Sequence, residues 1–188
     1  MANTLKFNPD EVIQRAMQLF WEKGFAGIST RDLQQQVHLN PGSLYSAFGS
    51  KAGLYSQALD HYAASREARL REARERTGSV TAAFREVFYQ GLCAAGGSQA
   101  PVCLLVRTLV ELADSQPELA AKAEALLKKT ERLFSELLQE AVENRELPAD
   151  TDVDALAKEL QIKMMGLRSY RACGGDPEAI RTMIDKLF

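Results

Sequence analysis

The chain has 188 residues, of which 46% are hydrophobic and 26% charged, and its net charge at pH 7 is −2. This is the composition of an ordinary globular protein. It holds three cysteines, an odd number in a chain without an export signal, so we do not expect a disulfide framework. No run of about 18 apolar residues occurs, and the N-terminus lacks the basic and then apolar pattern of a signal peptide. We therefore expect a cytoplasmic protein without a membrane segment.

Charge is distributed unevenly along the chain. Residues 1–76 carry 10 Lys and Arg against 8 Asp and Glu, a balance of +2, whereas residues 77–188 carry 13 against 17, a balance of −4. A more basic N-terminal part agrees with contact between that part and a nucleic acid, although the difference is small. Such binding would weaken with salt, because neutralised phosphates supply most of the non-specific affinity.

The apolar residues recur at helical spacing, and no segment has the two-residue alternation of a strand. The sequence therefore predicts an all-α protein of about nine helices. The first helix is expected over residues 9–23, with Asn8 as its N-cap and Gly24 directly after its last residue.

A short second helix is expected directly after Ser29. Ser29 can cap this helix, and Asp32, three residues on, is the acidic partner of a capping box. Leu33 and Val37 are four residues apart and so share one apolar face of the helix. The helix is therefore amphipathic although it is short.

A turn at His38 and Leu39 leads into a third helix. Asn40 can cap this helix, and Pro41 takes its first position, where a missing N–H costs nothing. Two helices joined in this way form a helix-turn-helix, in which the second helix reads base edges with residues near its N-terminus. The outward positions on its first turns are small or carry a hydroxyl, which suits close approach to phosphates and bases. These positions are Pro41, Gly42, Ser43, Tyr45 and Ser46.

The rest of the chain predicts six more helices. They are expected over residues 51–76, 80–95, 101 or 102 to 113, 117–145, 152–172 and 177–188. The clearest loop is at residues 96–101, rich in glycine and closed by proline, and Thr151 with Asp154 is the expected cap of the helix over 152–172. Residues 65–76 pair arginines with glutamates four residues apart. This run is either a solvated connecting helix or a tract of arginines that contacts DNA.

Two stretches near the N-terminus resemble the DNA-binding domain of the TetR family of transcriptional repressors. Residues 20–29, FWEKGFAGIS, resemble the end of the family's first helix and its glycine–aromatic–x–glycine link into the second. Residues 44–54, LYSAFGSKAGL, resemble the family signature LYxxFxxKxxL. The match runs without a gap through the helix-turn-helix, which makes it specific.

The resemblance implies which residues contact double-stranded operator DNA. The matching positions are Ser29, Thr30, Arg31, Pro41, Gly42, Ser43, Tyr45, Ser46 and Lys51. Tyr45 and Lys51 match the family's most typical phosphate contacts. The alternatives are a tyrosine ring packed under its helix and an ordinary surface lysine. Ala47 departs from members that have a larger polar residue there.

The resemblance also implies two domains and a homodimer. The helix-turn-helix domain is expected at residues 1–50 and a helical regulatory and dimerisation domain at residues 51–188, with 51–76 as the connecting helix. Helix-turn-helix dimers bind paired half-sites, so the operator should be near-palindromic. Family members dimerise through their last two helices, whose apolar residues could otherwise close the chain's own core. The expected interface residues are Ile162, Met165, Ile180, Met183, Ile184 and Leu187.

A small-molecule inducer is expected, but no set of residues identifies it. Aromatic residues, leucines and a methionine at helical spacing could line a pocket between helices, or could form plain core. They are Phe84, Phe88, Tyr89, Leu105, Leu109, Phe134, Met164 and Tyr170. No cofactor and no metal is expected, because metal-ligand spacings and phosphate loops are absent from the sequence.

Cys103 suggests an alternative kind of regulation. It lies at the expected start of a helix, where backbone amides stabilise a thiolate and make it reactive. The surrounding sequence resembles a subgroup that includes the repressor of N-ethylmaleimide reductase, which senses electrophiles and oxidants through a cysteine here. Pro101 and Val102 depart from that pattern. Cys103 is thus either a thiol sensor or a packing residue, and Cys93 and Cys173 are expected to pack.

The leading hypothesis is a DNA-binding repressor released by a small molecule, with thiol sensing as its alternative. An enzyme is not expected, because His38 and His61 lie far in sequence from the cysteines and no nucleophile motif occurs. A helical adaptor that has lost DNA binding is disfavoured, since Tyr45 and Lys51 are both present. An activator would carry the same DNA-binding residues as a repressor.

Overall fold

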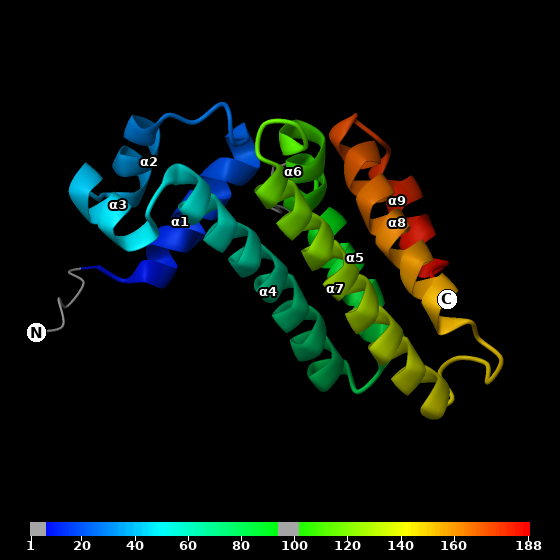
Figure 1. The fold of residues 1–188 in the computed structure, drawn as a ribbon. Helices are drawn as coiled ribbons and strands as arrows, with labels where there is room; N and C mark the ends of the chain where they lie inside the picture. Colours follow the sequence, from blue (N-terminus) through cyan, green and yellow to red (C-terminus); the bar gives the residue numbers. More distant parts are fainter. Residues whose placement is uncertain (1–6, 94–101) are drawn as a thin grey trace, which may run out of the picture. The chain divides into compact units, whose positions relative to one another are not determined.

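The structure is a computed structural model that describes residues 7–93 and 102–188 (Figure 1). Every regular element in these residues is a helix, and nine are formed, which confirms the predicted all-α class. In chain order they are α1 (Pro9–Lys23), α2 (Thr30–Val37), α3 (Pro41–Phe48), α4 (Lys51–Thr77), α5 (Val80–Leu92), α6 (Leu104–Leu112), α7 (Pro117–Glu143), α8 (Val153–Ala172) and α9 (Pro177–Asp185). The predicted loop at residues 96–101 lies outside the described residues.

Some helix ends differ from the prediction. α5 ends at Leu92, three residues early, and α6 begins at Leu104, two or three residues late. The cap of α8 is also different. Asp152 is the N-cap and accepts the Ala155 N–H at 3.0 Å, while the Thr151 hydroxyl donates to the Pro148 carbonyl at 2.7 Å. α8 begins at Val153, so Asp152 and not Thr151 is the residue directly before the helix, which is the N-cap position.

The described chain packs as two compact units. Unit 1 comprises Met1–Ala63 and Leu104–Glu124, and unit 2 comprises Ala64–Cys103 and Ala125–Phe188. The long helices α4 and α7 therefore contribute residues to both units. The predicted functional domains follow the order of the sequence, whereas these packing units are discontinuous.

Aromatic side chains form the centre of unit 1. The Tyr55 ring on α4 lies edge-on to Phe20, with 4.7 Å between ring centroids, and to Phe25 at 5.0 Å. The fully buried Tyr55 hydroxyl and the Thr108 hydroxyl of α6 are 2.8 Å apart, so a hydrogen bond satisfies both inside the core. Burial raises the pKa of Tyr55 more than this hydrogen bond lowers it. α6 thus belongs to the core that supports α1 to α3.

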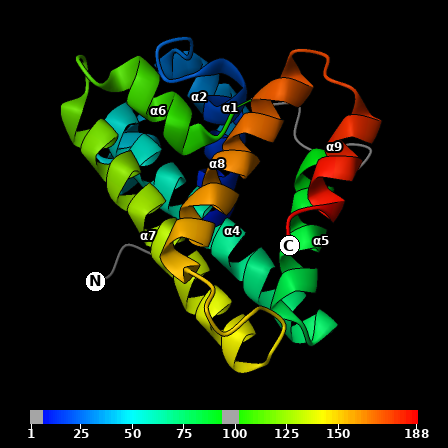
Figure 2. The same cartoon turned by 90° about the vertical axis from the view of Figure 1, so that its right-hand side faces the viewer.

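Unit 2 is built around α5, α8 and α9, which pack side by side (Figure 2). Its core consists of apolar residues from these helices and from the parts of α4 and α7 in this unit. Phe84 on α5 packs edge-on against Phe134 on α7, with 4.9 Å between ring centroids. This core supplies the apolar burial that stabilises the unit.

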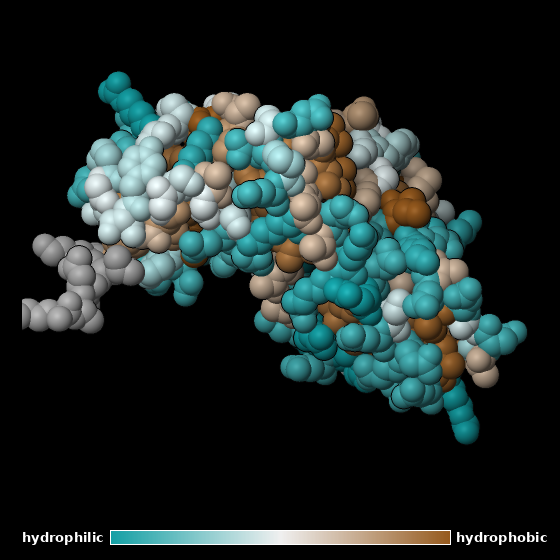
Figure 3. All heavy atoms as spheres, in the orientation of Figure 1, coloured by the Kyte–Doolittle hydropathy of each residue, from teal (hydrophilic) through white to brown (hydrophobic). Residues whose placement is uncertain are grey.

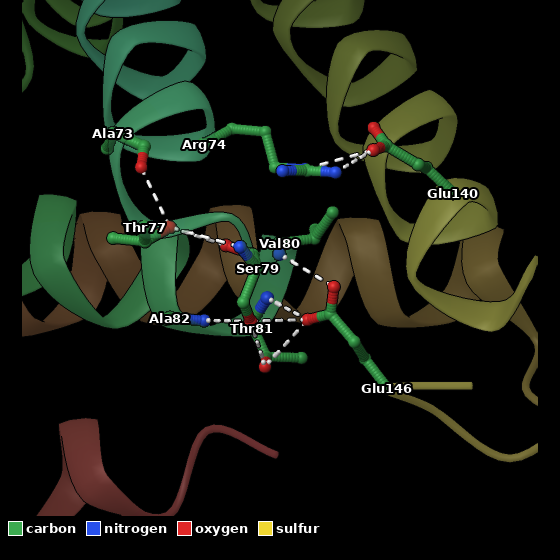
Figure 4. Close-up of polar contacts among 9 residues, drawn as sticks. All are labelled: Ala73, Arg74, Thr77, Ser79, Val80, Thr81, Ala82, Glu140 and Glu146. Carbon is green, nitrogen blue, oxygen red and sulfur yellow. Dashed lines mark hydrogen bonds and ion pairs between the residues drawn. The ribbon is translucent and has the colours of Figure 1, made fainter. Parts of the chain in front are cut away.

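A carboxylate caps the start of α5 from outside its own helix (Figure 4). Ser79 accepts the Ala82 N–H at 3.2 Å as the N-cap, while Glu146 accepts the Val80 and Thr81 N–H groups, each at 3.0 Å. The Ser79 and Thr81 hydroxyls donate to the same carboxylate at 2.6 and 3.0 Å. The three amides of the first turn, which no helix satisfies by itself, therefore all have acceptors.

Among residues 7–93 and 102–188, no helix is both long and apolar enough to cross a bilayer.

Candidate nucleic-acid interface

The first helix of the predicted helix-turn-helix is fixed by a capping box, as expected from the sequence. The Ser29 hydroxyl accepts the Asp32 N–H at 3.2 Å, and the Asp32 carboxylate accepts the Ser29 N–H at 2.8 Å. The Ser29 hydroxyl also donates to that carboxylate at 2.6 Å. Hydrogen bonds from Ser29 hold the pKa of Asp32 below its ordinary value. The N-terminus of α2 is thus set before any ligand binds.

The turn and the start of α3 follow the predicted chemistry. His38 is left-handed (φ 54°), and its N–H donates to the Gln34 carbonyl, which ends α2. The Asn40 side chain accepts the Ser43 N–H at 2.8 Å, and Pro41 is the first residue of α3. α2 and α3 then lie next to each other and beside α1 (Figure 1). Their buried residues are Leu33, Val37, Leu44 and Phe48.

Two of the predicted DNA-binding residues meet at the surface. The Tyr45 hydroxyl on α3 donates to the Thr30 hydroxyl on α2, with 3.2 Å between the oxygens. Tyr45 is 42% exposed, so its ring is not packed under the helix. The contact brings the first turn of α2 and the middle of α3 to one exposed face that carries two hydroxyls.

Lys51 is partly engaged within the chain. Its ammonium donates to the Ile28 carbonyl and lies 4.4 Å from the centroid of the Phe25 ring. Burial lowers the pKa of Lys51, and the nearby Asp32 carboxylate opposes that shift. An ammonium has three donors, so a contact with a phosphate would add to the bond with Ile28. Lys51 therefore holds the loop before α2 against α4 whether or not it contacts DNA.

The remaining predicted contact residues lie at the surface around the Thr30–Tyr45 pair. Ser29, Arg31, Pro41, Gly42 and Ser46 are exposed, and Ser43 is half-buried.

The arginine run of α4 is largely paired within unit 2. Arg71 bonds to Glu67 at 3.2 Å, and Arg74 and Arg76 form ion pairs with Glu140 and Glu86. These partners favour the connecting-helix interpretation over an arginine tract that contacts DNA, because three of the five arginines in the run pair with carboxylates of the same chain.

No pattern in the sequence indicates the contact between α6 and the end of α1. Arg107 donates from Nη1 to the carbonyls of Trp21 at 2.9 Å and Glu22 at 3.3 Å, and from Nε to Glu111 at 2.6 Å. It thereby satisfies carbonyls at the C-terminus of α1. A Cβ at Gly24 would come within 2.7 Å of the Arg107 guanidinium, so this glycine has a packing role as well as ending α1. The sequence indicates only the ion pair between Arg107 and Glu111, which are four residues apart on one helix.

Most residues of the predicted pocket lie in the core of unit 2. Phe84, Phe88 and Met164 are buried there, and Phe134 packs against them. Such packing is expected of an ordinary hydrophobic core, and the same side chains could also line a ligand site.

Of the other four predicted pocket residues, Tyr89 is half-buried and packs against the same core. Leu105 is buried and Leu109 half-buried, and both belong to unit 1. The Tyr89 hydroxyl donates to Asp185 on α9, and this hydrogen bond raises the pKa of Tyr89. Tyr170 is 42% exposed. The structure therefore does not gather all the predicted residues into one site.

The predicted dimer residues divide into two groups. Ile162 on α8 is 68% exposed and Met183 on α9 is 49% exposed, while Met165 is half-buried. The other three lie in the chain's own core: Ile180, Ile184 and Leu187. Hydrophobic residues also reach the surface as separate brown areas on the face drawn in Figure 3. Only the first group is available to a second copy.

Cys103 precedes the first residue of α6 and is buried, with 9% exposure. That burial favours packing over ready access for an oxidant. Within the described residues, no cluster of histidine, cysteine or acidic side chains is arranged to hold a metal ion.

Both parts of the chain match models of known protein families. Residues 12–58 match the family model "Bacterial regulatory proteins, tetR family", and residues 95–187 match "Tetracyclin repressor-like, C-terminal domain". The HTH-type transcriptional regulator YezE of Bacillus subtilis (strain 168), described as uncharacterized, is 30% identical over 187 residues, which cover 98% of this chain and 96% of YezE. The repressor BdcR of Escherichia coli (strain K12) is 46% identical over 57 residues, 30% of this chain and 29% of BdcR.

Solved structures have the same fold. A cysteine mutant of the TetR family transcriptional regulator CifR, solved in complex with 26-bp double-strand operator DNA, aligns with a TM-score of 0.77 and 28% identity, over 97% of this chain and 96% of CifR. Reduced NemR of E. coli aligns with a TM-score of 0.80 over 95% of each chain, and at 19% identity this likeness shows the fold alone.

Proposed function

This chain belongs to the TetR family of bacterial regulatory proteins, and we propose that it acts as a homodimeric repressor that a small molecule releases from a near-palindromic operator. It is a DNA-binding transcriptional regulator and not an enzyme. Two parts of this proposal are tested below: that a dimer represses by binding the operator, and that an inducer releases it.

The observation that carries DNA binding is the exposed face around Thr30 and Tyr45. It combines two hydroxyls, the capped N-termini of α2 and α3, and small residues on the first turns of α3. Helix N-termini and hydroxyls are donors to phosphate oxygens. The small residues let the α3 backbone approach the base edges in the major groove. The operator-bound CifR structure supports the same use of this fold.

The exposed apolar residues of α8 and α9 support a dimer. Ile162 and Met183 lie on the two helices that the resemblance assigns to the interface, and both are too exposed to stabilise the monomer much. A symmetric dimer buries the same patch on both copies and sets the spacing of two recognition helices. Glu159 and Lys163, an ion pair on α8, would border this patch.

Release by an inducer follows from differential binding. A ligand can bind more tightly to a dimer whose recognition helices are wrongly spaced for the operator. It then lowers the affinity for the operator by an amount set by the difference between its binding free energies for the two dimer states. Cys103 modification is the alternative trigger. If thiol chemistry rather than a ligand releases the DNA, N-ethylmaleimide will abolish operator binding by the wild type and leave Cys103→Ser unaffected.

The test is fluorescence anisotropy of the purified chain with double-stranded DNA from the intergenic region upstream of its own coding sequence. We expect tight binding with two chains per site, and a steep loss of affinity as salt rises. A scrambled DNA of the same length is the control. Equal affinity for the scrambled DNA, or one chain per site at saturation, would contradict the proposal.

A further inference from the structure

The side chains that α3 offers to DNA have few of the groups that distinguish one base pair from another. Its outward positions are Pro41, Gly42, Ser43, Tyr45 and Ser46. None of these has the paired donors or acceptors with which arginine, asparagine or glutamine reads a base, and a hydroxyl contacts several bases equally well. α3 therefore suits close approach of its backbone more than discrimination between sequences.

Asn40, at the start of α3, has a side-chain amide but uses it within the turn. The amide oxygen accepts the Ser43 N–H at 2.8 Å, which fixes the side chain against the first turn of the helix. An asparagine that reads adenine needs both its oxygen and its nitrogen for the base. A side chain that reads base edges is therefore expected on α2.

Arg31 is a charged side chain in the first turn of α2, the turn that is tied to α3. It directly follows Thr30, whose hydroxyl accepts the hydrogen bond from Tyr45 at 3.2 Å. Arg31 is exposed and forms no ion pair among residues 7–93 and 102–188. The neighbouring Asp32 carboxylate instead accepts the Ser29 N–H at 2.8 Å and the Ser29 hydroxyl at 2.6 Å. The guanidinium of Arg31 is thus available to a ligand beside α3.

The chemistry of the guanidinium favours a base over a phosphate as that ligand. The planar fork of donors matches O6 and N7 of guanine in the major groove, which is the commonest specific contact between a side chain and a base. The hydroxyls of Thr30 and Tyr45 already supply donors for phosphates on this face. Gln35, also exposed on α2, would read adenine, but it lies one turn farther along the helix.

We propose that Arg31 selects the operator sequence through a bidentate contact with O6 and N7 of one guanine in each half-site. This inference rests on the proposed function, in which two chains bind a near-palindromic operator. α3 then contributes its backbone and its hydroxyls, and α2 contributes the choice of base. Loss of a base contact relaxes specificity, whereas loss of a phosphate contact weakens binding to all sequences alike.

The test changes single atoms of the bases. The intergenic DNA is amplified with 7-deazaguanine in place of guanine, which replaces N7 by C–H and leaves the base pairing intact, and separately with 7-deazaadenine in place of adenine. In anisotropy titrations the wild type should bind the 7-deazaguanine DNA at least about tenfold more weakly than natural DNA, and the 7-deazaadenine DNA within about twofold of it. Equal affinity for natural and 7-deazaguanine DNA overturns the proposal, as does a loss that is equal or larger on 7-deazaadenine DNA.

Two variants of exposed residues on α2 assign the effect to one side chain. Arg31→Ala should bind natural and 7-deazaguanine DNA equally, because it has no group that uses N7. Gln35→Ala is the matched control and should keep the wild-type difference. The comparison is repeated at lower salt, where phosphate contacts keep a weakened variant measurable. A full difference that persists in Arg31→Ala, or one that disappears in Gln35→Ala, overturns the proposal.

The inference and the proposed function fail in different ways. A chain that binds its intergenic DNA no better than the scrambled DNA contradicts the proposed function. A chain that distinguishes these two DNAs, but binds natural and 7-deazaguanine DNA equally, refutes the inference alone.

Discussion

Replacing Glu146 with glutamine should destabilise unit 2, because the carboxylate is the acceptor for four donors at the start of α5 (Figure 4). Glutamine keeps one acceptor oxygen, removes the negative charge and turns an NH₂ group toward the donors. Hydrogen bonds to charged groups contribute about 1.5–3 kcal/mol each. Because the site is partly exposed, water can replace some of these bonds, and we expect a loss of about 2 kcal/mol.

The assay is thermal and urea unfolding of the full chain at neutral pH, with Glu136→Gln as the matched control on an exposed part of α7. A loss of about 2 kcal/mol lowers the melting temperature by about 4–8 °C in a chain of this size. The control should be unchanged. A change of less than about 0.5 kcal/mol for Glu146→Gln, which is the usual range for surface substitutions, would refute the capping role.

The pH dependence gives the same prediction a second readout. Burial disfavours the charged Glu146 carboxylate, but the hydrogen bonds outweigh burial, so the pKa in the folded chain lies below the ordinary value. A lowered carboxyl pKa contributes stability that is complete above the unfolded pKa of about 4.3 and is lost as the pH falls through the folded pKa. The difference between the wild type and Glu146→Gln should therefore shrink below about pH 4. A constant difference between pH 7 and the acid range would contradict this assignment.

Three further substitutions test other parts of the structure. His38→Gly should stabilise the chain by about 0.5–1 kcal/mol in thermal unfolding, because only glycine adopts the left-handed turn without strain; a destabilised variant would show that the imidazole has a compensating role. Arg107→Ala should cost about 1–2 kcal/mol through the lost bonds to the α1 carbonyls, whereas the exposed Arg132→Ala should not, and equal effects would argue against this contact. Ile162→Lys with Met183→Lys should convert a dimer into a monomer in light scattering, because buried lysines would face each other, and an unchanged dimer would place the interface elsewhere.

Local chemistry explains why the sequence predicted the helix-turn-helix so well. Ser29 with Asp32 and Asn40 before Pro41 each act within three residues, and both caps form as expected. The cap of α8 shows the limit of the same reasoning. Thr151 and Asp152 are both good cap residues, and the choice between them depends on the residue at which the helix begins. That residue is Val153, so Asp152 caps the helix.

Contacts between distant segments could not be predicted in the same way. The sequence places Arg107 on α6 but does not show that it reaches the end of α1. It likewise marks Lys51 as a phosphate contact without showing the bond to Ile28, and it marks Ile180 and Ile184 as apolar without showing that they are buried in the chain's own core. The sequence does not distinguish Arg168 from the other arginines, because its burial is what makes it unusual.

The most direct test of the DNA-binding face compares two tyrosines of equal exposure. Tyr45 and Tyr170 are each 42% exposed, and only Tyr45 lies on the helix-turn-helix. In anisotropy titrations with operator DNA, Tyr45→Phe should lose about tenfold in affinity, because its hydroxyl can no longer donate to a phosphate. Tyr170→Phe should bind as the wild type does. Equal affinities for the two variants would contradict the assignment of α2 and α3 as the surface that binds DNA.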